Sequence, residues 1–390
     1  MQNTLDISAG GYPHPAESLH LNKASLWSAI VFGTVAMLVF LLMPAYVGIL
    51  ASLGFNDAQL GNLASMDLAG ITVASVLAML WIKTANWRVA AILSMLGLIG
   101  ANLLCLGTTD YMTLMALRLI AGLAAGTGIV LAFTIIANSD SPDRYTGLFV
   151  TIQVLAQSLG FVFAPTLIES AGSDSFYYLF ALLALASIPL VAFIPSRHQK
   201  ANDVTSTDES KKGSKLAVIL ALTSMTLFFL GQGAIWAFGD RIGVSGGLDS
   251  QAVANALALT AFASLFGALL SAWMDVKFGR TWPILIAILV QLAALTLFYG
   301  EMSSIYFTLL FSIFAFCWNF GIAFQVGVVA SMDRTGRYTA LIPAFQGAGL
   351  ALGPFIAGIF LAGESYININ IVSGFALAAY LFIILPLTKK

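Results

Sequence analysis

The chain has 390 residues, of which 59% are hydrophobic and only 9% are charged. Soluble domains carry roughly 25% charged residues, so this composition excludes a soluble globule and indicates a polytopic membrane protein. The net charge of −1 and the absence of a basic tract give no indication of a nucleic-acid partner. Cys105 and Cys317 lie in apolar runs whereas the three histidines do not, so neither a metal site nor a cofactor is predicted.

Residues 1–24 are polar and lack an apolar core, so they are predicted to be a cytoplasmic tail rather than a signal peptide. A helix needs about 20 apolar residues to cross a bilayer, and the remainder of the chain predicts twelve such spans. In chain order they are 26–50, 58–82, 89–107, 111–137, 145–168, 176–195, 216–239, 250–274, 282–300, 305–330, 338–362 and 367–387. The charged segment 196–215 is predicted to be a flexible linker between a six-helix bundle at 25–195 and another at 216–390.

The charges in the loops predict the orientation of the chain. With the N-terminus inside, 15 of the 17 Lys and Arg residues lie on the cytoplasmic side, Arg241 lies outside and Arg118 lies within a span. This bias follows the positive-inside rule. Both termini are therefore predicted to be cytoplasmic, in the inner membrane of a cell, and the chain is expected to act as a monomer.

The two halves of the sequence resemble each other at a nearly constant offset. The matches are DAQ at 57–59 with DSQ at 249–251, Arg88 with Arg280, YMTL at 111–114 with YFTL at 306–309, RYTGL at 144–148 with RYTAL at 337–341, Gln153 with Gln346, and Leu159-Gly160 with Leu352-Gly353. Asp57 and Asp249 are each expected to cap the helix that follows. Because each half has an even number of spans, the repeats are predicted to be parallel, with a binding site where they meet near the membrane midplane.

These features together resemble the major facilitator superfamily. The segment RLIAG at 118–122 is similar to a motif of that family on span four, and GLALGPFIAG at 349–358 is similar to another. The second motif marks proton-coupled antiporters when it lies on span five, but here it lies on span eleven, which does not favour efflux. A loop motif survives partly as DVKFGR at 275–280, whereas its first-half counterpart at 83–88 keeps only basic residues. The resemblance implies an all-α fold of two six-helix bundles and transport by alternating access.

Two charges of opposite sign, Asp67 and Arg118, lie within predicted spans. Counted from the outer ends of spans two and four, they reach depths of about 15 Å and about 12 Å, so each is the other's expected ionic partner. The positions aligned with them in the second half are Leu259 and Ile313, and the absence of charge there favours a functional origin. Two interpretations remain open: a static buried ion pair, or a cavity-facing Arg118 that binds substrate while Asp67 carries a coupling proton.

Other polar or aromatic side chains within the spans are further candidates for substrate contact. Amides inside a membrane need partners, so they are expected to face protein or a cavity. The resemblance implies that spans one, four, seven and ten line the cavity. The candidates, beside Arg118, are Tyr46, Gln153, Gln157, Gln232, Trp236, Trp318, Asn319 and Gln346. Helix–helix hydrogen bonding is the alternative for the glutamines, an interfacial position is the alternative for Tyr46, and Gly122 and Gly126 are expected to serve helix packing.

The predicted function is secondary active transport of a small organic solute. Arg118 as the lone intramembrane cation favours an organic anion, and Asp67 favours protons as the coupling ion. The alternative is proton-driven efflux of amphipathic compounds, which the 28 Phe and 7 Trp residues would allow. A membrane enzyme is disfavoured because the spans contain no histidine and one carboxylate, so no catalytic residues are predicted; a receptor is disfavoured by the repeat.

Overall fold

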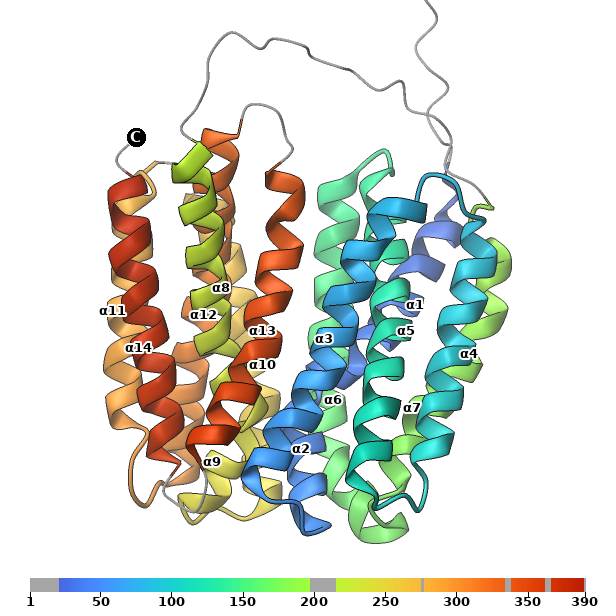
Figure 1. Ribbon diagram of the computed structural model, residues 1–390, viewed down its shortest axis with the longest axis horizontal. Helices are drawn as coiled ribbons and strands as arrows, with labels where there is room; N and C mark the ends of the chain where they lie inside the picture. The colour runs from blue at the N-terminus through green and yellow to red at the C-terminus, as the bar shows by residue number, and fades with distance from the viewer. Residues whose placement is uncertain (1–20, 197–214, 275–276, 334–337, 362–365, 389–390) are drawn as a thin grey trace, which may run out of the picture.

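The structure is a computed structural model that describes residues 21–196, 215–274, 277–333, 338–361 and 366–388, and these residues form helices joined by short connections, with no strand among them. Figure 1 shows two bundles of helices side by side. The N-terminal bundle consists of α1 (Lys23–Leu41), α2 (Met43–Ser52), α3 (Asp57–Trp81), α4 (Trp87–Cys105), α5 (Tyr111–Ala137), α6 (Pro142–Ala171), α7 (Ser175–Ser187) and η1 (Ile188–Phe193). The C-terminal bundle consists of α8 (Lys215–Ala237), α9 (Gly239–Ser245), α10 (Ser250–Met274), α11 (Thr281–Leu297), α12 (Ser304–Met332), η2 (Thr339–Leu341), α13 (Ile342–Phe360), α14 (Ile367–Ile384) and η3 (Leu385–Leu387).

All twelve predicted spans correspond to helices. In the described part of the chain, eleven helical segments are long and apolar enough to cross a membrane. The remaining predicted span, the ninth in chain order, corresponds to the shorter apolar helix α11, with 17 residues. Large apolar side chains on the outside of the bundles, such as Leu80 (78% exposed) and Phe382 (84% exposed), fit contact with lipid. The predicted tail at 1–24 and linker at 196–215 lie almost wholly outside the described residues.

The first and seventh spans are each broken into two helices. The first break, at Leu42, has a local cause: Pro44 has no N–H to donate to the carbonyl of Phe40, four residues earlier. The second break, at Phe238, precedes Gly239 and involves no proline. The two breaks lie 238 − 42 = 196 residues apart, close to the offset between the sequence repeats. The broken helices therefore confirm that the halves are parallel repeats.

The helix caps differ from the prediction at one of the two expected positions. Asn56, not Asp57, caps α3, because its side chain accepts from the Gln59 N–H while the Gln59 side chain accepts from the Asn56 N–H. This reciprocal pair is a capping box, which leaves Asp57 as the first residue inside the helix. Asp249 does cap α10, accepting from the Ala252 N–H at 2.9 Å.

Glycines bring α3 and α5 into backbone contact. A Cβ atom at Gly122 would collide with the carbonyl oxygen of Asp67, and one at Gly126 would lie 2.6 Å from the carbonyl oxygen of Ile71. Gly70 of α3 packs in the same way against the backbone of α5 at Leu119. This is the close approach that small residues permit in membrane helices, and it confirms the packing interpretation of Gly122 and Gly126.

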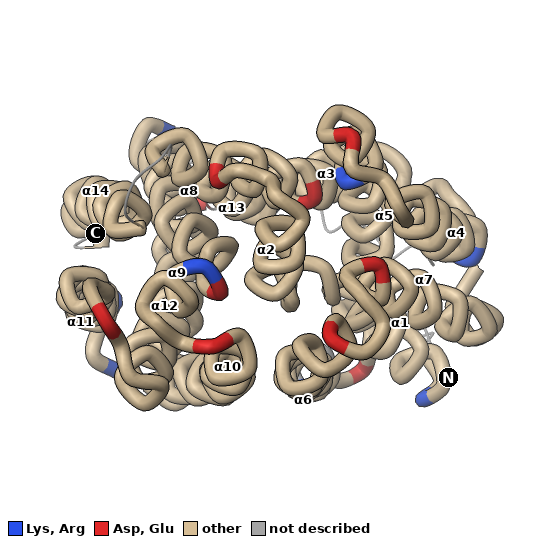
Figure 2. The backbone as a smooth tube through the Cα atoms, turned by 90° about the horizontal axis from the view of Figure 1, so that it is seen from below, with Lys and Arg blue, Asp and Glu red and all other residues tan. Residues whose placement is uncertain are grey.

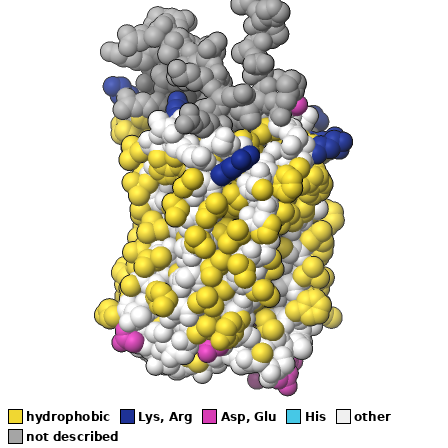
Figure 3. Space-filling view, turned by 90° about the vertical axis from the view of Figure 1, so that its right-hand side faces the viewer, with side chains coloured by type: hydrophobic (Ala, Val, Ile, Leu, Met, Phe, Trp, Pro, Cys, Tyr) yellow, Lys and Arg dark blue, Asp and Glu magenta, His cyan; other side chains and the backbone are white. Residues whose placement is uncertain are grey.

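Most of the described charged residues separate to opposite ends of the bundles, as Figure 3 shows for one side of the molecule, although Asp140 and Asp333 lie at the end that carries the cations. We call one end the basic end, where the described cations Lys23, Lys83, Arg88, Arg144, Lys215, Lys277 and Arg280 lie at helix termini or in the adjoining turns. We call the other the acidic end, where Asp57, Asp110, Glu169, Asp174, Asp240, Asp249 and Glu301 lie. Arg241 lies at the acidic end.

Candidate functional site

Asp67 of α3 and Arg118 of α5 form the predicted ion pair inside the N-terminal bundle. The Nη1 atom of Arg118 lies 3.9 Å from Oδ1 of Asp67, and both side chains are almost completely buried. The α3–α5 contact at Gly122, one helical turn from Arg118, fixes the separation of the two backbones. The other terminal nitrogen, Nη2, donates to Oδ1 of Asn102 at 3.1 Å and to Sγ of Cys105 at 3.3 Å, both on α4.

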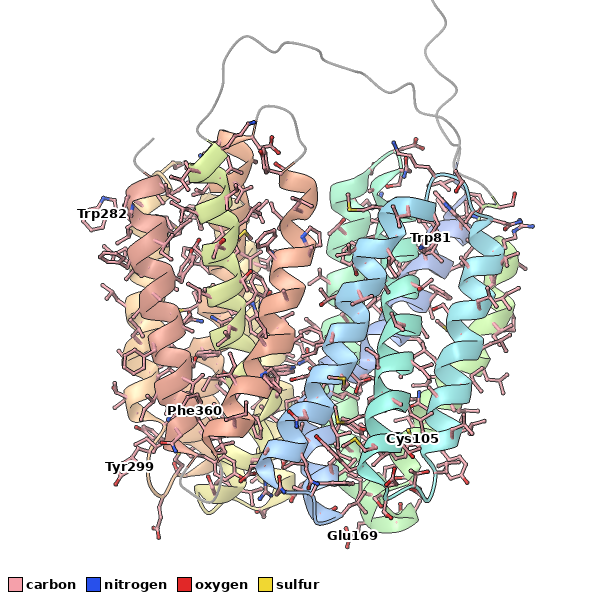
Figure 4. The ribbon with its side chains drawn as sticks, viewed as in Figure 1. Trp81, Cys105, Glu169, Trp282, Tyr299 and Phe360 are labelled. Atoms are coloured by element: carbon pink, nitrogen blue, oxygen red, sulfur yellow. The ribbon has the colours of Figure 1, made fainter. Side chains whose placement is uncertain are left out.

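Two tyrosines complete the surroundings of the guanidinium. Its carbon lies 5.5 Å from the centre of the Tyr46 ring and 5.4 Å from that of Tyr177, within the range of cation–π attraction. The two hydroxyls are 3.4 Å apart. Several polar atoms of this cluster remain without a hydrogen-bond partner in the described part of the chain, namely Nε and Nη1 of Arg118 and Oδ2 of Asp67. The cluster is thus held together by charge and aromatic rings, with hydrogen-bonding capacity left over. Figure 4 shows Cys105, one of its members, within the N-terminal bundle toward the acidic end.

A separate cavity of about 250 Å³ lies between the two bundles, at the level of the middle of the helices. We call it the central cavity. Its lining comes from α1 and α6 of one bundle and from α8, α10, α12 and α13 of the other. Among its lining residues are the predicted candidates Gln153, Gln157, Trp236, Trp318 and Asn319. None of the lining side chains is ionisable at neutral pH, and neither Arg118, Asp67 nor Tyr46 is among them.

The polar groups of the central cavity are only partly used within the protein. The indole Nε1 of Trp236 donates to the carbonyl of Phe40 at 3.0 Å, the carbonyl that Pro44 leaves without a helical donor. The buried Nε1 of Trp318 has no hydrogen-bond partner among the residues that the structure describes. The Gln153 amide donates to the Met37 sulfur at 2.8 Å, and the Asn319 amide donates to the carbonyl of Ala315 at 3.3 Å. The side-chain oxygens of Gln153 and Asn319 make no hydrogen bond in the described residues, and neither does the side-chain amide of Gln157.

The remaining predicted candidates lie elsewhere. Gln232 is fully buried inside the C-terminal bundle, where its amide donates to Oε1 of Gln291 at 3.1 Å and accepts from Nε2 of Gln291 at 3.4 Å. Gln291 also donates to the carbonyl of Phe314. This arrangement is the helix–helix hydrogen bonding that was the alternative for the glutamines. Gln346, the repeat partner of Gln153, is half-buried on α13 and is not among the residues that line the central cavity.

The alignment of Leu259 and Ile313 with Asp67 and Arg118 does not survive in three dimensions. Leu259 is 58% exposed and Ile313 is 39% exposed, whereas Asp67 and Arg118 are buried. Aligning the helices by their caps gives a better match, because 249 − 56 and 303 − 110 both equal 193. Asp67 then corresponds to Thr260 and Arg118 to Phe311, which are both buried. The second half therefore still carries no charge at these positions.

Sequence reasoning missed four polar residues that the structure assigns to these sites. Thr260 and Ser264 line the central cavity, Asn102 contacts Arg118, and Gln291 pairs with Gln232. Asn102 and Gln291 are isolated polar side chains in spans three and nine, so a complete list of polar residues within spans would have found them. Thr260 and Ser264 give no such signal, because a hydroxyl on a membrane helix commonly bonds to its own backbone.

The bundles are tied together between the middle of the helices and the acidic end. Ser158 donates to the carbonyl of Ala258 at 2.9 Å, and the Tyr366 hydroxyl donates to Oδ1 of Asp57 at 2.9 Å. The Arg241 Nε donates in turn to the Tyr366 hydroxyl at 3.1 Å. Figure 2, viewed from the acidic end, shows α2 between the bundles beside α9. The central cavity lies on the basic-end side of these contacts.

Asp240 of α9 lies at this junction. It packs against the backbone of Gly48 in α2, where an added Cβ atom would collide with its carboxylate. Burial raises the pKa of this carboxyl from 3.8 to about 6, although the neighbouring Arg241 opposes the shift. The described residues contain no group of three His, Cys, Asp or Glu side chains that could hold a metal ion.

A comparison of the sequence with known families decides the classification. The sequence profile of the Major Facilitator Superfamily matches residues 28–332. The chain belongs to the Major Facilitator Superfamily. Members of this superfamily are transporters, so the chain is a multi-pass membrane transporter.

Solved structures of this superfamily share the fold. A structure of the nucleoside transporter NupG matches with a TM-score of 0.73 and 13% identity, covering 93% of this chain and 99% of that one. A D-xylose–proton symporter matches with a TM-score of 0.68 and 16% identity, covering 92% and 95%. A bacterial homologue of the human lysosomal transporter Spinster, in an inward-facing and unoccupied conformation, matches with a TM-score of 0.64 and 14% identity, covering 94% of both chains. No curated protein sequence matches this chain.

Proposed function

We propose that this chain moves a small, uncharged, polar organic solute across the membrane by alternating access, with the solute bound in the central cavity. The observation that carries the proposal is the composition of the cavity lining, which has free amide and indole groups from both bundles and no ionisable side chain. A site between two parallel repeats near the midplane is where alternating access requires it.

The chemistry of the lining favours a solute with hydroxyl or carbonyl groups and a flat apolar face. Gln153, Gln157 and Asn319 offer amides, and Trp318 offers an N–H donor that no described residue engages. The Trp318 ring lies 6.2 Å from Phe229 and 6.5 Å from Trp236, so aromatic walls border the polar groups. An organic anion, the leading expectation from the sequence, loses its support because Arg118 lies outside this lining. Two structural relatives are a nucleoside transporter and a D-xylose–proton symporter, and nucleosides and D-xylose are uncharged polar solutes.

We further propose that protons drive the transport and that Asp67 is the coupling group. Asp67 is buried, and Arg118 lies 3.9 Å from its carboxylate. Its Oδ2 atom has no hydrogen-bond partner within the described part of the chain. Uptake of a proton by this carboxylate would remove its attraction for Arg118 and alter the packing of α3 against α5. The same helix α3 packs against α13 of the other bundle, where Gly61 lies against the carbonyl of Pro354. A change at Asp67 can therefore reach the contact between the bundles. The xylose–proton symporter among the structural relatives supports proton symport.

We place the basic end in the cytoplasm, following the positive-inside rule, in the inner membrane of a cell and with the chain acting as a monomer. The described Lys and Arg residues at helix termini lie at that end, with Arg241 as the exception. Cysteine labelling at residues of the two ends in intact cells tests this orientation, since only residues outside the cell react with an impermeant reagent.

The test of the substrate proposal is a thermal-shift screen of the purified protein against sugars, nucleosides, organic acids and amphipathic cations. A neutral solute is expected to raise the unfolding midpoint of the wild type but not of the Gln157→Ala or Asn319→Ala variants. The control is Gln346→Ala, which removes an amide outside the central cavity and should respond like the wild type. Stabilisation by organic acids alone would overturn the proposal, and stabilisation by amphipathic cations alone would favour the efflux alternative.

The coupling proposal is tested by transport of the identified solute into proteoliposomes. The Asp67→Asn variant is expected to retain solute exchange without a gradient while losing accumulation driven by a pH gradient. Full accumulation by this variant would exclude Asp67 as the coupling group without affecting the assignment of the central cavity.

A further inference from the structure

The C-terminal bundle carries an apolar groove of about 740 Å³ on its outer surface, between α10, α11 and α12. We call it the outer groove. Its walls include Phe266 and Leu270 of α10 and Trp282 and Ile286 of α11, all of which are exposed. Ser312 and Phe316 of α12 form part of its floor. None of the lining side chains carries a charge at neutral pH, and the thiol of Cys317 at the floor is buried, so the groove suits a hydrocarbon chain.

The outer groove and the central cavity lie on opposite sides of the same two helices. On α12, Trp318 and Asn319 face the central cavity, whereas Phe316 and Cys317 face the outer groove. On α10, Thr260 and Ser264 face the cavity, and Ala263 and Phe266 face the groove. The two helices touch where Gly267 meets the carbonyl of Phe316, which closes the floor of the groove. An occupant of the groove is thus separate from the solute but contacts the helices that form its site.

One mouth of the outer groove lies at the basic end, beside an exposed cation. Lys277 follows α10, and its Nζ donates to the carbonyl of Trp273 at 3.0 Å and lies 5.1 Å from the centre of that indole ring. An ammonium has three donors, so two remain available. Arg280 packs against Gly327 of α12 in the same turn, and the sequence 275–280 contains two cations against one acid.

Two exposed tryptophans lie near the mouth of the outer groove at the basic end. Trp273 and Trp282 are 66% and 64% exposed, and Figure 4 shows Trp282 at the basic end pointing away from the bundle. Tryptophan is enriched where lipid headgroups meet the acyl chains. The groove walls extend from this level along α10 from Met274 to Ala263 and along α11 from Trp282 to Val290. These stretches correspond to about 12–17 Å of helix, about half of a ~30 Å hydrocarbon core.

We propose that the outer groove binds an anionic phospholipid from the leaflet at the basic end. The acyl chains fill the groove, which has the depth of one leaflet, and the phosphate accepts hydrogen bonds from Lys277. The bound lipid supports α10 and α12 from outside and so stabilises the walls of the central cavity. The groove has an apolar interior for the chains and a cation at its mouth for the headgroup, which together select an anionic lipid over a zwitterionic one.

Native mass spectrometry of the purified full-length chain tests this proposal, with phosphatidylglycerol and phosphatidylcholine of identical acyl chains as the probes. The wild type is expected to bind one phosphatidylglycerol about fivefold more tightly than phosphatidylcholine, as expected for one cation near a phosphate. Lys277→Ala should remove this preference and leave binding of phosphatidylcholine unchanged. Ser312→Phe, which fills the groove, should weaken binding of both lipids at least tenfold.

Leu182→Phe is the matched control, because it adds the same ring to an exposed position on α7, far from the groove in sequence and in the other bundle. It should bind both lipids like the wild type. Unfolding midpoints measured without added lipid show whether each variant is folded. Unchanged binding by a folded Ser312→Phe variant would overturn the assignment of the groove, and equal affinity of the wild type for the two lipids would overturn the role of Lys277.

Discussion

In the N-terminal bundle, Asp67 and Arg118 face each other across α3 and α5, and in the C-terminal bundle, Gln232 and Gln291 face each other across α8 and α11. The two amides exchange hydrogen bonds in both directions, so the C-terminal bundle links its helices without any charge. The ionic pair is less complete, because Nε and Nη1 of Arg118 and Oδ2 of Asp67 have no hydrogen-bond partner in the described residues. Charge inside a membrane is costly. Linking two helices therefore does not by itself explain why the N-terminal bundle uses a charged pair where the C-terminal bundle uses two amides.

The largest effect is expected from Arg118→Ala, which leaves the Asp67 carboxylate buried without its cation. Breaking a buried ion pair from one side costs about 3–5 kcal/mol, so the unfolding midpoint of the purified protein should fall steeply at neutral pH. Protonation of the lone carboxyl removes the unpaired charge, so the loss should be smaller in acid. Thermal unfolding in detergent across a pH series measures both effects.

The double variant Asp67→Leu with Arg118→Met separates structure from function at this pair. Apolar residues of similar volume often replace a buried ion pair without loss of stability, so this variant should unfold close to the wild type. It should nevertheless lose accumulation driven by a pH gradient. A stable double variant with full accumulation would make the pair a purely structural link, comparable to the two glutamines.

An intermediate effect is expected at Asp240, which lies between the bundles rather than inside one. Its pKa of about 6 in the folded protein exceeds the ordinary value of 3.8, so the folded state holds the proton more tightly than the unfolded state. The contribution of Asp240 to the free energy of unfolding is therefore complete below pH 4 and is lost as the pH rises to about 6, at a cost of about 3 kcal/mol. The difference in unfolding midpoint between wild type and Asp240→Asn should change across this interval and stay constant above it.

The smallest effect is expected from Gln291→Leu, which leaves the Gln232 amide without its partner. An unpaired buried amide costs about 1 kcal/mol, and hydrogen bonds between membrane helices average about 0.6 kcal/mol. Changing both glutamines to leucine should recover most of this loss. A loss as large as that of Arg118→Ala would show that the amide pair is as important to its bundle as the charges are to theirs.

The span boundaries and the pairing of Asp67 with Arg118 were predictable because hydrophobic length and depth along a helix are properties of the sequence. The direction in which Arg118 points was not. Helix α5 packs against α1, α3, α4 and α6, so its apolar residues face protein on several sides and do not indicate which side faces the space between the bundles. For the same reason the sequence does not distinguish Gln157, which lines the central cavity, from Gln232, which does not. The register of the two repeats is sensitive in the same way, because a slip of two residues turns a helix by about 200° and exchanges buried Phe311 for exposed Ile313.

Pro44 has a consequence that reaches beyond the break in the first span. Because it cannot donate to the carbonyl of Phe40, that carbonyl is free to accept from Trp236 of the opposite bundle. When the bundles separate at the acidic end, both groups lose their partner at the edge of the central cavity. A solute with one hydroxyl could then accept from the indole and donate to the carbonyl. Binding of the solute would then compensate for the hydrogen bond between Trp236 and Phe40 that opening breaks. An occupied transporter would therefore open more readily at the acidic end than an empty one.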